Sequence, residues 1–173
     1  MKATYVALLR SVNVAGHGKV KMSDLADVFR RLGYAEVSTY IQSGNVIFMT
    51  DEDVAAADIE AAICADLGMD ITIMVRTAAE LARVVEGNPF VQADPSTLHV
   101  GFMPGAPSVT AADLDLQRFL PEAVVVDGAN LYLHLPNGMG RAKLPVSLGR
   151  QLGVPVTFRN WNTVTKLAEL ANG

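Results

Sequence analysis

Cysteine is almost absent from this sequence, in which Cys64 is the single one among 173 residues. One thiol excludes an internal disulfide framework, and no cysteine–histidine spacing typical of a zinc site is present. We therefore expect a chain that works in a reducing cytoplasm and binds no metal and no cofactor. Because Cys64 follows Ile63 on a predicted helix, we expect its thiol to lie in the core and to be chemically inert.

Long apolar runs are absent as well. The longest stretch without a charge, residues 95–112, is interrupted by Pro104, Gly105 and Pro107, so it cannot form a helix that crosses a membrane. The apolar residues after Lys2 end at Arg10 before any small-residue cleavage site, which argues against a signal peptide. We expect no membrane partner.

Basic residues are too few to coat a duplex, since 14 Lys and Arg face 18 Asp and Glu and the net charge is -4. The charge is nevertheless uneven. Seven acidic residues and no basic one lie in residues 51–70, whereas residues 1–21 carry four bases and no acid, and residues 130–173 carry five bases and one acid. If the two basic ends meet in the fold, an acidic protein has a basic surface; otherwise these charges are solvated separately.

What is abundant is apolar residues, at 50%, with a mean hydropathy of +0.27, so the chain can bury a sizeable core. In the first half, apolar periodicity and turn residues predict strand, helix, strand, strand, helix and strand in that order. Ser23 is the expected N-cap of the first helix, and Gly33 and Gly68 are the expected ends of the two helices. The predicted elements cover residues 4–9, 23–32, 36–42, 46–50, 54–67 and 71–76.

The second half repeats this order over residues 97–103, 111–120, 122–126, 131–135, 144–152 and 154–158. The predicted fold class is α+β: tandem ferredoxin-like (βαββαβ) α-β plaits packed as one compact body. We expect a first ferredoxin-like subdomain at residues 1–76, a connector helix and loop at 77–96, a second ferredoxin-like subdomain at 97–158 and a C-terminal tail helix at 159–173.

Alternation along the strands bears on RNA binding. In the first half both faces of the central strands are apolar, so we expect that sheet to be covered. In the second half His99, Tyr132 and His134 are expected on one face, opposite the leucines, where they could stack on bases. Ordinary half-exposed strand residues are the alternative, and because the RNA-recognition sequence pattern is missing, nucleic acid is an unlikely partner.

Several sequence blocks resemble the bacterial domain-of-unknown-function family 1697. They are Leu9–Gly16 with Lys19–Met22, Tyr40–Val46, Asn88–Phe90, and Thr157–Thr163 with Lys166–Leu167. The blocks occur in the family's order over essentially the whole chain. The resemblance implies a cytosolic protein of two ferredoxin-like halves and brings no established activity.

A glycine-containing loop, residues 15–19, precedes the first helix and offers backbone N–H groups beside Lys19 and Lys21. It does not match the phosphate-loop motif, because Asn13 and Val20 stand where that motif has Gly and Ser or Thr. An anion site and an ordinary surface loop are both open. Further candidate ligand-binding residues nearby are Arg10, Asn13, Ser43 and Asn45.

The densest polar cluster, residues 159–163, contains the single tryptophan. Arg159 could pair with a phosphate, Trp161 could stack on a ligand ring, and Asn160 or Asn162 could cap the last helix. The alternative is that Trp161 anchors the core and Arg159 holds the tail. The candidate ligand-binding residues of this cluster are Arg159, Asn160, Trp161, Asn162 and Thr163.

No catalytic constellation is recognisable, since His17 has no cysteine, serine elbow or paired carboxylate beside it. We therefore expect a protein that binds a small anionic ligand, of phosphate or nucleotide type, in a cleft between the N-terminal loop and residues 159–163. An enzyme of unknown reaction using the same cleft is a second hypothesis. A third is an interaction or oligomerisation module that pairs through exposed strand edges with another chain or a second copy. We expect the protein to be a monomer or a weak homodimer.

Overall fold

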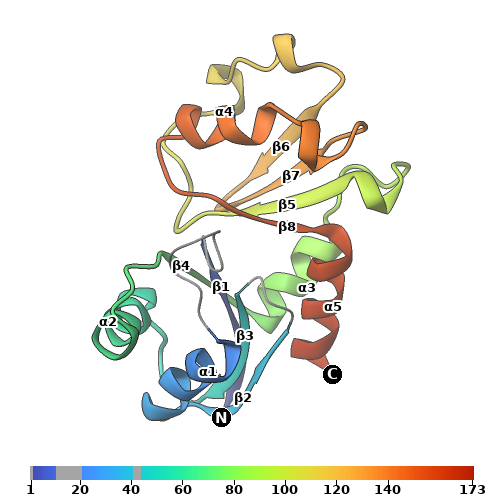
Figure 1. Ribbon diagram of the computed structural model, residues 1–173. Coiled ribbons are helices and arrows are strands. Elements are labelled where there is room, and N and C mark those ends of the chain that lie inside the picture. Colours follow the sequence, from blue (N-terminus) through green and yellow to red (C-terminus); the bar gives the residue numbers. More distant parts are fainter. Residues whose placement is uncertain (1, 11–20, 41–43) are drawn as a thin grey trace. The chain divides into compact units, whose positions relative to one another are not determined.

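A computed structural model describes residues 2–10, 21–40 and 44–173, and these form a mixed α+β structure. Internal packing divides the chain into two compact units. The first comprises Met1–Arg83 with Leu167–Gly173, and the second comprises Val84–Lys166. Each unit contains one four-stranded antiparallel sheet (Figure 1).

The first unit has the predicted element order of strand, helix, strand, strand, helix, strand. Its sheet has the strand order β2-β3-β1-β4, so the first and third strands are central. The strand β4 is followed directly by α3 (Ala78–Glu86). The elements before α3 are β1 (Ala3–Leu9), α1 (Met22–Arg31), β2 (Ala35–Thr39), β3 (Asn45–Thr50), α2 (Ala56–Leu67) and β4 (Ile73–Thr77).

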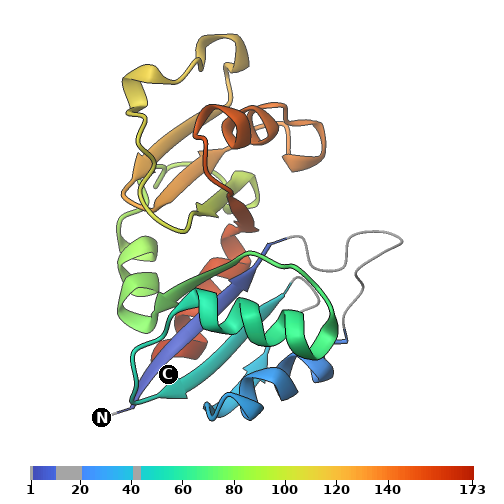
Figure 2. The same ribbon diagram turned by 90° about the vertical axis from the view of Figure 1, so that its left-hand side faces the viewer.

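The core of the first unit lies between one face of this sheet and the helices α1 and α2, which cover the same face (Figures 1 and 2). Alternation along β1 directs Ala7 and Leu9 to that core. The opposite face is also buried, because Val6 and Leu8 are fully inaccessible to solvent. The prediction that both faces of this sheet are covered is confirmed.

Two expectations for the helices of the first unit are wrong. The helix α1 begins at Met22 with Lys21 at the N-cap position, so Ser23 lies inside the helix and does not cap it. The earlier start places Met22 on the apolar face with Leu25, where it is buried. Cys64 is exposed, because one residue beyond the buried Ile63 the helix α2 has turned by about 100° away from the core.

The second unit has the strand order β6-β7-β5-β8, the same arrangement of central and edge strands as in the first unit. Its sheet packs on α4 through leucines of β7 and of the helix itself. The last helix, α5 (Trp161–Asn172), begins in this unit, and its residues from Leu167 onward belong to the first. The other elements are β5 (Leu98–Phe102), β6 (Ala123–Asp127), β7 (Asn130–His134), α4 (Leu144–Gln151), β8 (Thr157–Asn160) and single 3₁₀ turns at Pro95–Thr97, Ala111–Asp113, Gln117–Phe119 and Met139–Arg141.

The predicted helix at residues 111–120 is not formed. Two separate 3₁₀ turns stand there, with extended backbone at Leu114 between them. The Asp113 carboxylate accepts hydrogen bonds from the Thr110 N–H, at 2.9 Å, and from its hydroxyl, at 3.0 Å, which closes the first turn on itself. Pro121 disfavours helical backbone at Leu120, so the segment cannot continue as a helix. The prediction of a helix rested on the spacing of apolar residues. It did not take account of the Asp113 hydrogen bonds and of Pro121, which prevent a continuous helix here.

The strand register corrects the predicted RNA-stacking face. Residues paired across strands share a face, and β5 and β7 pair Val100 with Tyr132 and His99 with Leu133. Tyr132 and His134 therefore lie on the face opposite His99. Tyr132 is 3% exposed, and its hydroxyl donates to the Val84 carbonyl at 2.8 Å. The stacking platform that the sequence left open as an alternative therefore does not form, and His99 and Tyr132 are buried rather than half-exposed.

Across the part of the chain that the structure describes, no helix combines the length and apolarity needed to cross a membrane.

Candidate functional site

Arg159, one of the candidate ligand-binding residues from the sequence, lies buried on β8. It is 7% exposed, and its Nη1 donates to the Thr157 hydroxyl at 2.7 Å and to the Phe158 carbonyl at 3.0 Å. Burial lowers the pKa of the Arg159 guanidinium to about 10, because a low-dielectric surrounding disfavours its charged form. These contacts favour the interpretation that Arg159 holds the strand together.

The neighbouring polar residues build the start of α5. The Asn160 side chain accepts a hydrogen bond from the Thr163 N–H at 2.8 Å, which makes Asn160 rather than Asn162 the helix cap. Asn162 is exposed, Thr163 is buried and Trp161 is half-buried. The predicted strand at 154–158 is shifted to Thr157–Asn160, where it pairs with β5.

The candidates of the first unit are placed separately. Asn45 is fully buried and donates to the Tyr40 carbonyl at 3.0 Å, so its amide connects the ends of β2 and β3. Arg10 and Lys21 are exposed, at the end of β1 and before α1. The predicted ligand-binding residues Asn13, Lys19 and Ser43 lie outside the described residues.

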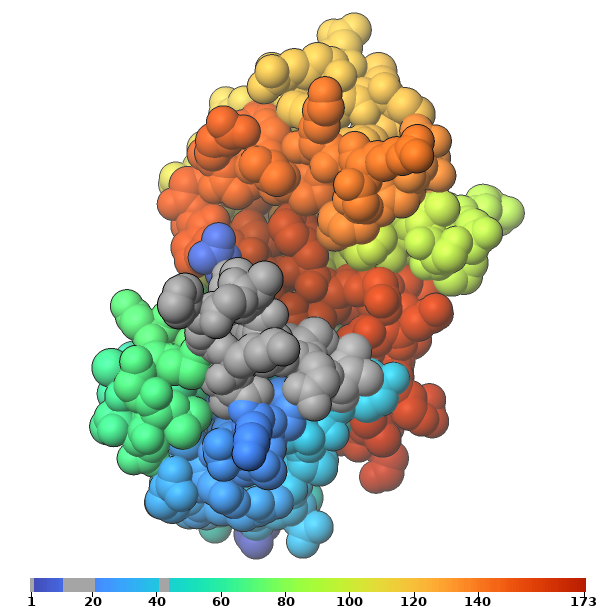
Figure 3. Space-filling view, in the orientation of Figure 1, coloured from blue at the N-terminus to red at the C-terminus, as the bar shows by residue number. Residues whose placement is uncertain are grey.

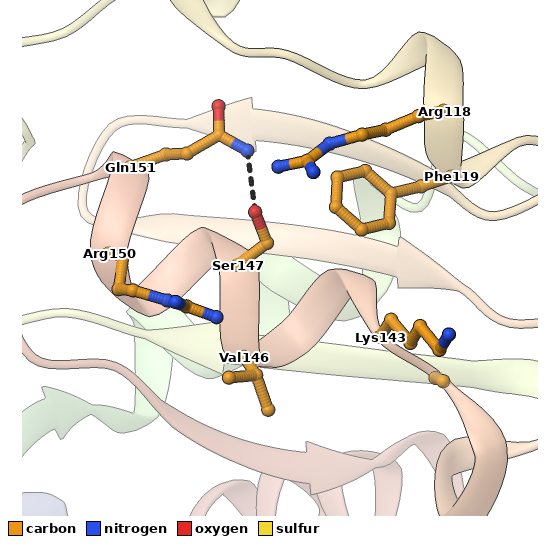
Figure 4. A pocket seen from close by; sticks show the side chains of 8 residues that line it. Arg118, Phe119, Lys143, Val146, Ser147, Arg150 and Gln151 are labelled. Atoms are coloured by element: carbon orange, nitrogen blue, oxygen red, sulfur yellow. Dashed lines mark hydrogen bonds between the residues drawn. The ribbon is translucent and has the colours of Figure 1, made fainter.

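The second unit has a pocket of about 530 Å³ on α4 (Figure 4). In Figure 3 the surface of α4, coloured orange, faces the viewer. Three of the lining side chains are cations and none is acidic. The lining residues are Arg118, Phe119, Ala142, Lys143, Val146, Ser147, Arg150 and Gln151.

Hydrogen bonds of Gln151 join the two sides of this pocket. Its Oε1 accepts from the Asp115 N–H at 2.6 Å, and its Nε2 donates to the Asp115 carbonyl at 3.1 Å and to the Ser147 hydroxyl oxygen at 2.8 Å. A side chain of α4 is thereby bound to the backbone of the segment that carries Arg118. The distance in sequence between residues 115 and 151 explains why no local pattern predicted the pocket.

The cations of the pocket are accessible. Arg118 forms an ion pair with Asp115, Nε to Oδ2, at 3.0 Å, with both side chains more than half exposed. Such an exposed pair contributes only about 0.2–1 kcal/mol, so an anion can compete with Asp115 for the guanidinium. In Figure 4 the guanidinium groups of Arg118 and Arg150 extend into the pocket from opposite sides.

Comparison with known proteins agrees with the sequence blocks. The sequence profile of a family described as "Protein of unknown function (DUF1697)" matches residues 1–132. The chain belongs to this DUF1697 family. No curated protein matches this DUF1697 chain. A solved structure described as conserved bacterial protein SP0830 from Streptococcus pneumoniae is similar to it in fold, with a TM-score of 0.73 and 17% identity over 100% of both chains.

The sequence did not single out the pocket residues of this DUF1697 chain as a site. Lys143 and Arg150 were visible as members of the basic C-terminal segment, and that charge excess was the one available signal. Arg118 could not be grouped with them, because the predicted helix at 111–120 was wrong. Among the described residues, no group of three or more His, Cys, Asp and Glu side chains is placed to hold a metal ion.

His99 is the one described residue of the second unit with a buried, unpartnered side-chain atom. Its Nδ1 has no hydrogen-bond partner, and the residue is 9% exposed. Burial lowers the pKa of the His99 imidazole below its ordinary value of 6.5, because the charged form loses hydration.

Stability should therefore fall on acidification. The unfolded chain binds a proton at His99 as the pH falls through about 6.5, whereas the folded chain does so only at lower pH, so the free energy of unfolding decreases below that pH. One such group contributes a slope of at most about 1.4 kcal/mol per pH unit. Urea unfolding between pH 8 and pH 5, followed by Trp161 fluorescence, should show a smaller decrease for His99→Leu than for the natural chain. Parallel pH profiles for the two chains would contradict this.

Proposed function

We propose that this chain binds a small anionic ligand of the phosphate class in the α4 pocket of its second unit. The ligand class is the one that the sequence predicts, while the site is different. The observation that carries the proposal is that Arg118, Lys143 and Arg150 line one pocket that has no acidic lining residue. Guanidinium groups suit phosphate because their N–H donors match its oxygen atoms in geometry and charge.

Removal of one pocket cation should weaken anion binding about tenfold, since a charge-assisted hydrogen bond contributes roughly 1.5 kcal/mol or more. The variants are Arg118→Gln and Arg150→Gln, titrated with inorganic phosphate and a nucleoside monophosphate by calorimetry and by NMR. Arg141→Gln is the matched control, because Arg141 is an exposed cation of the same unit that does not line the pocket. Equal affinities for all three variants, or no binding by the natural chain at millimolar ligand, would refute the proposal.

A second candidate function, self-association through a strand edge, is favoured by the composition of β6. This edge strand contains three consecutive valines, and Val125 is 40% exposed. An edge strand with an apolar run such as Val124–Val126 is a template for a second chain. Light scattering should then show a mass that increases with concentration, and Val125→Lys should abolish the increase. A mass independent of concentration would exclude this function.

The support for a finer description of the fold is the strand order. Numbered within each unit, both sheets read second, third, first, fourth, the order expected of ferredoxin-like plaits. We propose that both units are such plaits and that the second has lost its first helix. We also propose that the chain works in a reducing cytoplasm, which its single cysteine supports.

A further inference from the structure

The lining of the α4 pocket combines cationic, polar and apolar side chains. Figure 4 shows Ser147 between the guanidinium groups of Arg118 and Arg150. Phe119, beside the Arg118 guanidinium, and Val146, beside that of Arg150, supply apolar surface (Figure 4). A ligand that contacts both kinds of surface must itself be part anion and part apolar.

The polar side chains of the pocket offer donors but few acceptors. Both polar atoms of the Gln151 side chain are already engaged, with Asp115 and Ser147. Ser147 is 7% exposed, and its oxygen accepts from Gln151, so its hydroxyl hydrogen is left to donate. Together with the two guanidinium groups this hydroxyl makes a set of donors suited to the oxygen atoms of one phosphate group.

The apolar surface favours a planar ring. The guanidinium carbon of Arg118 lies 4.8 Å from the centroid of the Phe119 ring, so a charged plane and an aromatic ring lie against each other at the pocket wall. Flat ligand rings stack on both kinds of surface, whereas an alkyl chain gains only the burial of its area. Phosphate alone would leave this surface, and most of the volume of about 530 Å³, unused.

We propose that the ligand of the α4 pocket is a phosphate ester with a planar aromatic ring, of the nucleoside monophosphate class. Its phosphate binds between Arg118 and Arg150 beside the Ser147 hydroxyl, and its ring packs against Phe119. This inference rests on the proposed function of the same pocket. It adds that the ring contributes to affinity and that the phosphate alone binds weakly.

The test compares four ligands on the full chain by calorimetry: a nucleoside monophosphate, ribose 5-phosphate, an alkyl phosphate of similar length and the nucleoside without phosphate. The nucleoside monophosphate should bind about tenfold more tightly than ribose 5-phosphate, the size of gain that ring stacking supplies. It should also bind more tightly than the alkyl phosphate and the nucleoside. Equal affinities for the nucleoside monophosphate and either other phosphate would overturn the inference and leave the proposed function intact. Absence of binding by every phosphate would overturn both.

The role of the ring is checked on the protein side with Phe119→Tyr and Phe119→Leu. The tyrosine variant should keep the tenfold preference for the nucleoside monophosphate over ribose 5-phosphate, whereas the leucine variant, which keeps apolar packing, should lose most of it. Nuclear Overhauser contacts between the Phe119 ring and base protons, measured on the natural chain, give a readout that does not depend on a variant folding. Preference retained in Phe119→Leu, together with absence of these contacts, would place the ring elsewhere and overturn the inference.

Discussion

Replacement of Phe48 by alanine should lower the free energy of unfolding of the first unit by about 3–5 kcal/mol. Phe48 is fully buried on β3, at the centre of an aromatic cluster. Its ring centroid lies 4.5 Å from that of Tyr34, 5.3 Å from that of Phe29 and 5.7 Å from that of Tyr5. The truncation removes the transfer free energy of the ring and leaves a cavity among side chains that pack from several directions. A loss of this size is a large part of the stability of a typical domain.

The measurement is urea unfolding followed by far-ultraviolet circular dichroism, which reports both units, and by Trp161 fluorescence, which reports the second. Phe90→Ala is the matched control. The Phe90 ring is half-buried, and its one ring contact among the described residues is with His134, at a centroid distance of 5.5 Å, so the same truncation should cost clearly less there. Equal losses for the two variants would show that the aromatic cluster does not hold the first unit together.

Replacement of Gly101 by valine should destabilise the second unit by about 3 kcal/mol or more, and alanine there should cost about 1–3 kcal/mol. A Cβ atom at Gly101 would lie 2.8 Å from Leu131 Cδ1 and 2.9 Å from Val156 Cγ1. Neither neighbour has room to retreat, because Leu131 is fully buried and Val156 is 6% exposed. Glycine is required here by space and not by backbone conformation.

Trp161 fluorescence during urea unfolding measures this effect in the unit that contains Gly101. The control is Gly105→Ala, because a Cβ atom at Gly105 meets no atom within 4 Å. The control should change the free energy of unfolding by less than about 0.5 kcal/mol. If Gly101→Ala and Gly105→Ala changed the free energy of unfolding equally, β5 would not pack closely against Leu131 and Val156.

Much of the fold could be predicted from local pattern. The eight strands of the described residues were all predicted, the last of them a few residues too early, since alternating or continuous apolar runs bounded by turn residues are a local property. Gly68, with a φ of 68°, ends α2 where the sequence placed the end of that helix. The prediction failed at residues 111–120, where the hydrogen bonds of Asp113 and the effect of Pro121 outweighed an apolar spacing that resembled a helix.

The site was harder to predict than the fold. Arg159 has the chemistry of a ligand-binding residue, yet its hydrogen bonds to Thr157 and Phe158 make it a structural one. Burial decides between these roles, and burial depends on which strands pair. His99 and Tyr132 show the same limit of local patterns. The alternation of side chains along each strand was predicted correctly, but the register between β5 and β7, which decides which residues share a face, was not.

By itself, then, the sequence determined the family, the α+β organisation in two halves and the charge excess of residues 130–173, because composition and local periodicity carry that information. The tertiary structure alone decided that Arg118 lines the same pocket as Lys143 and Arg150. The contact that brings them together, from Gln151 to the backbone of Asp115, spans 36 residues of chain. A contact between residues so far apart in sequence depends on the packing of the whole unit, so no local sequence pattern predicts it.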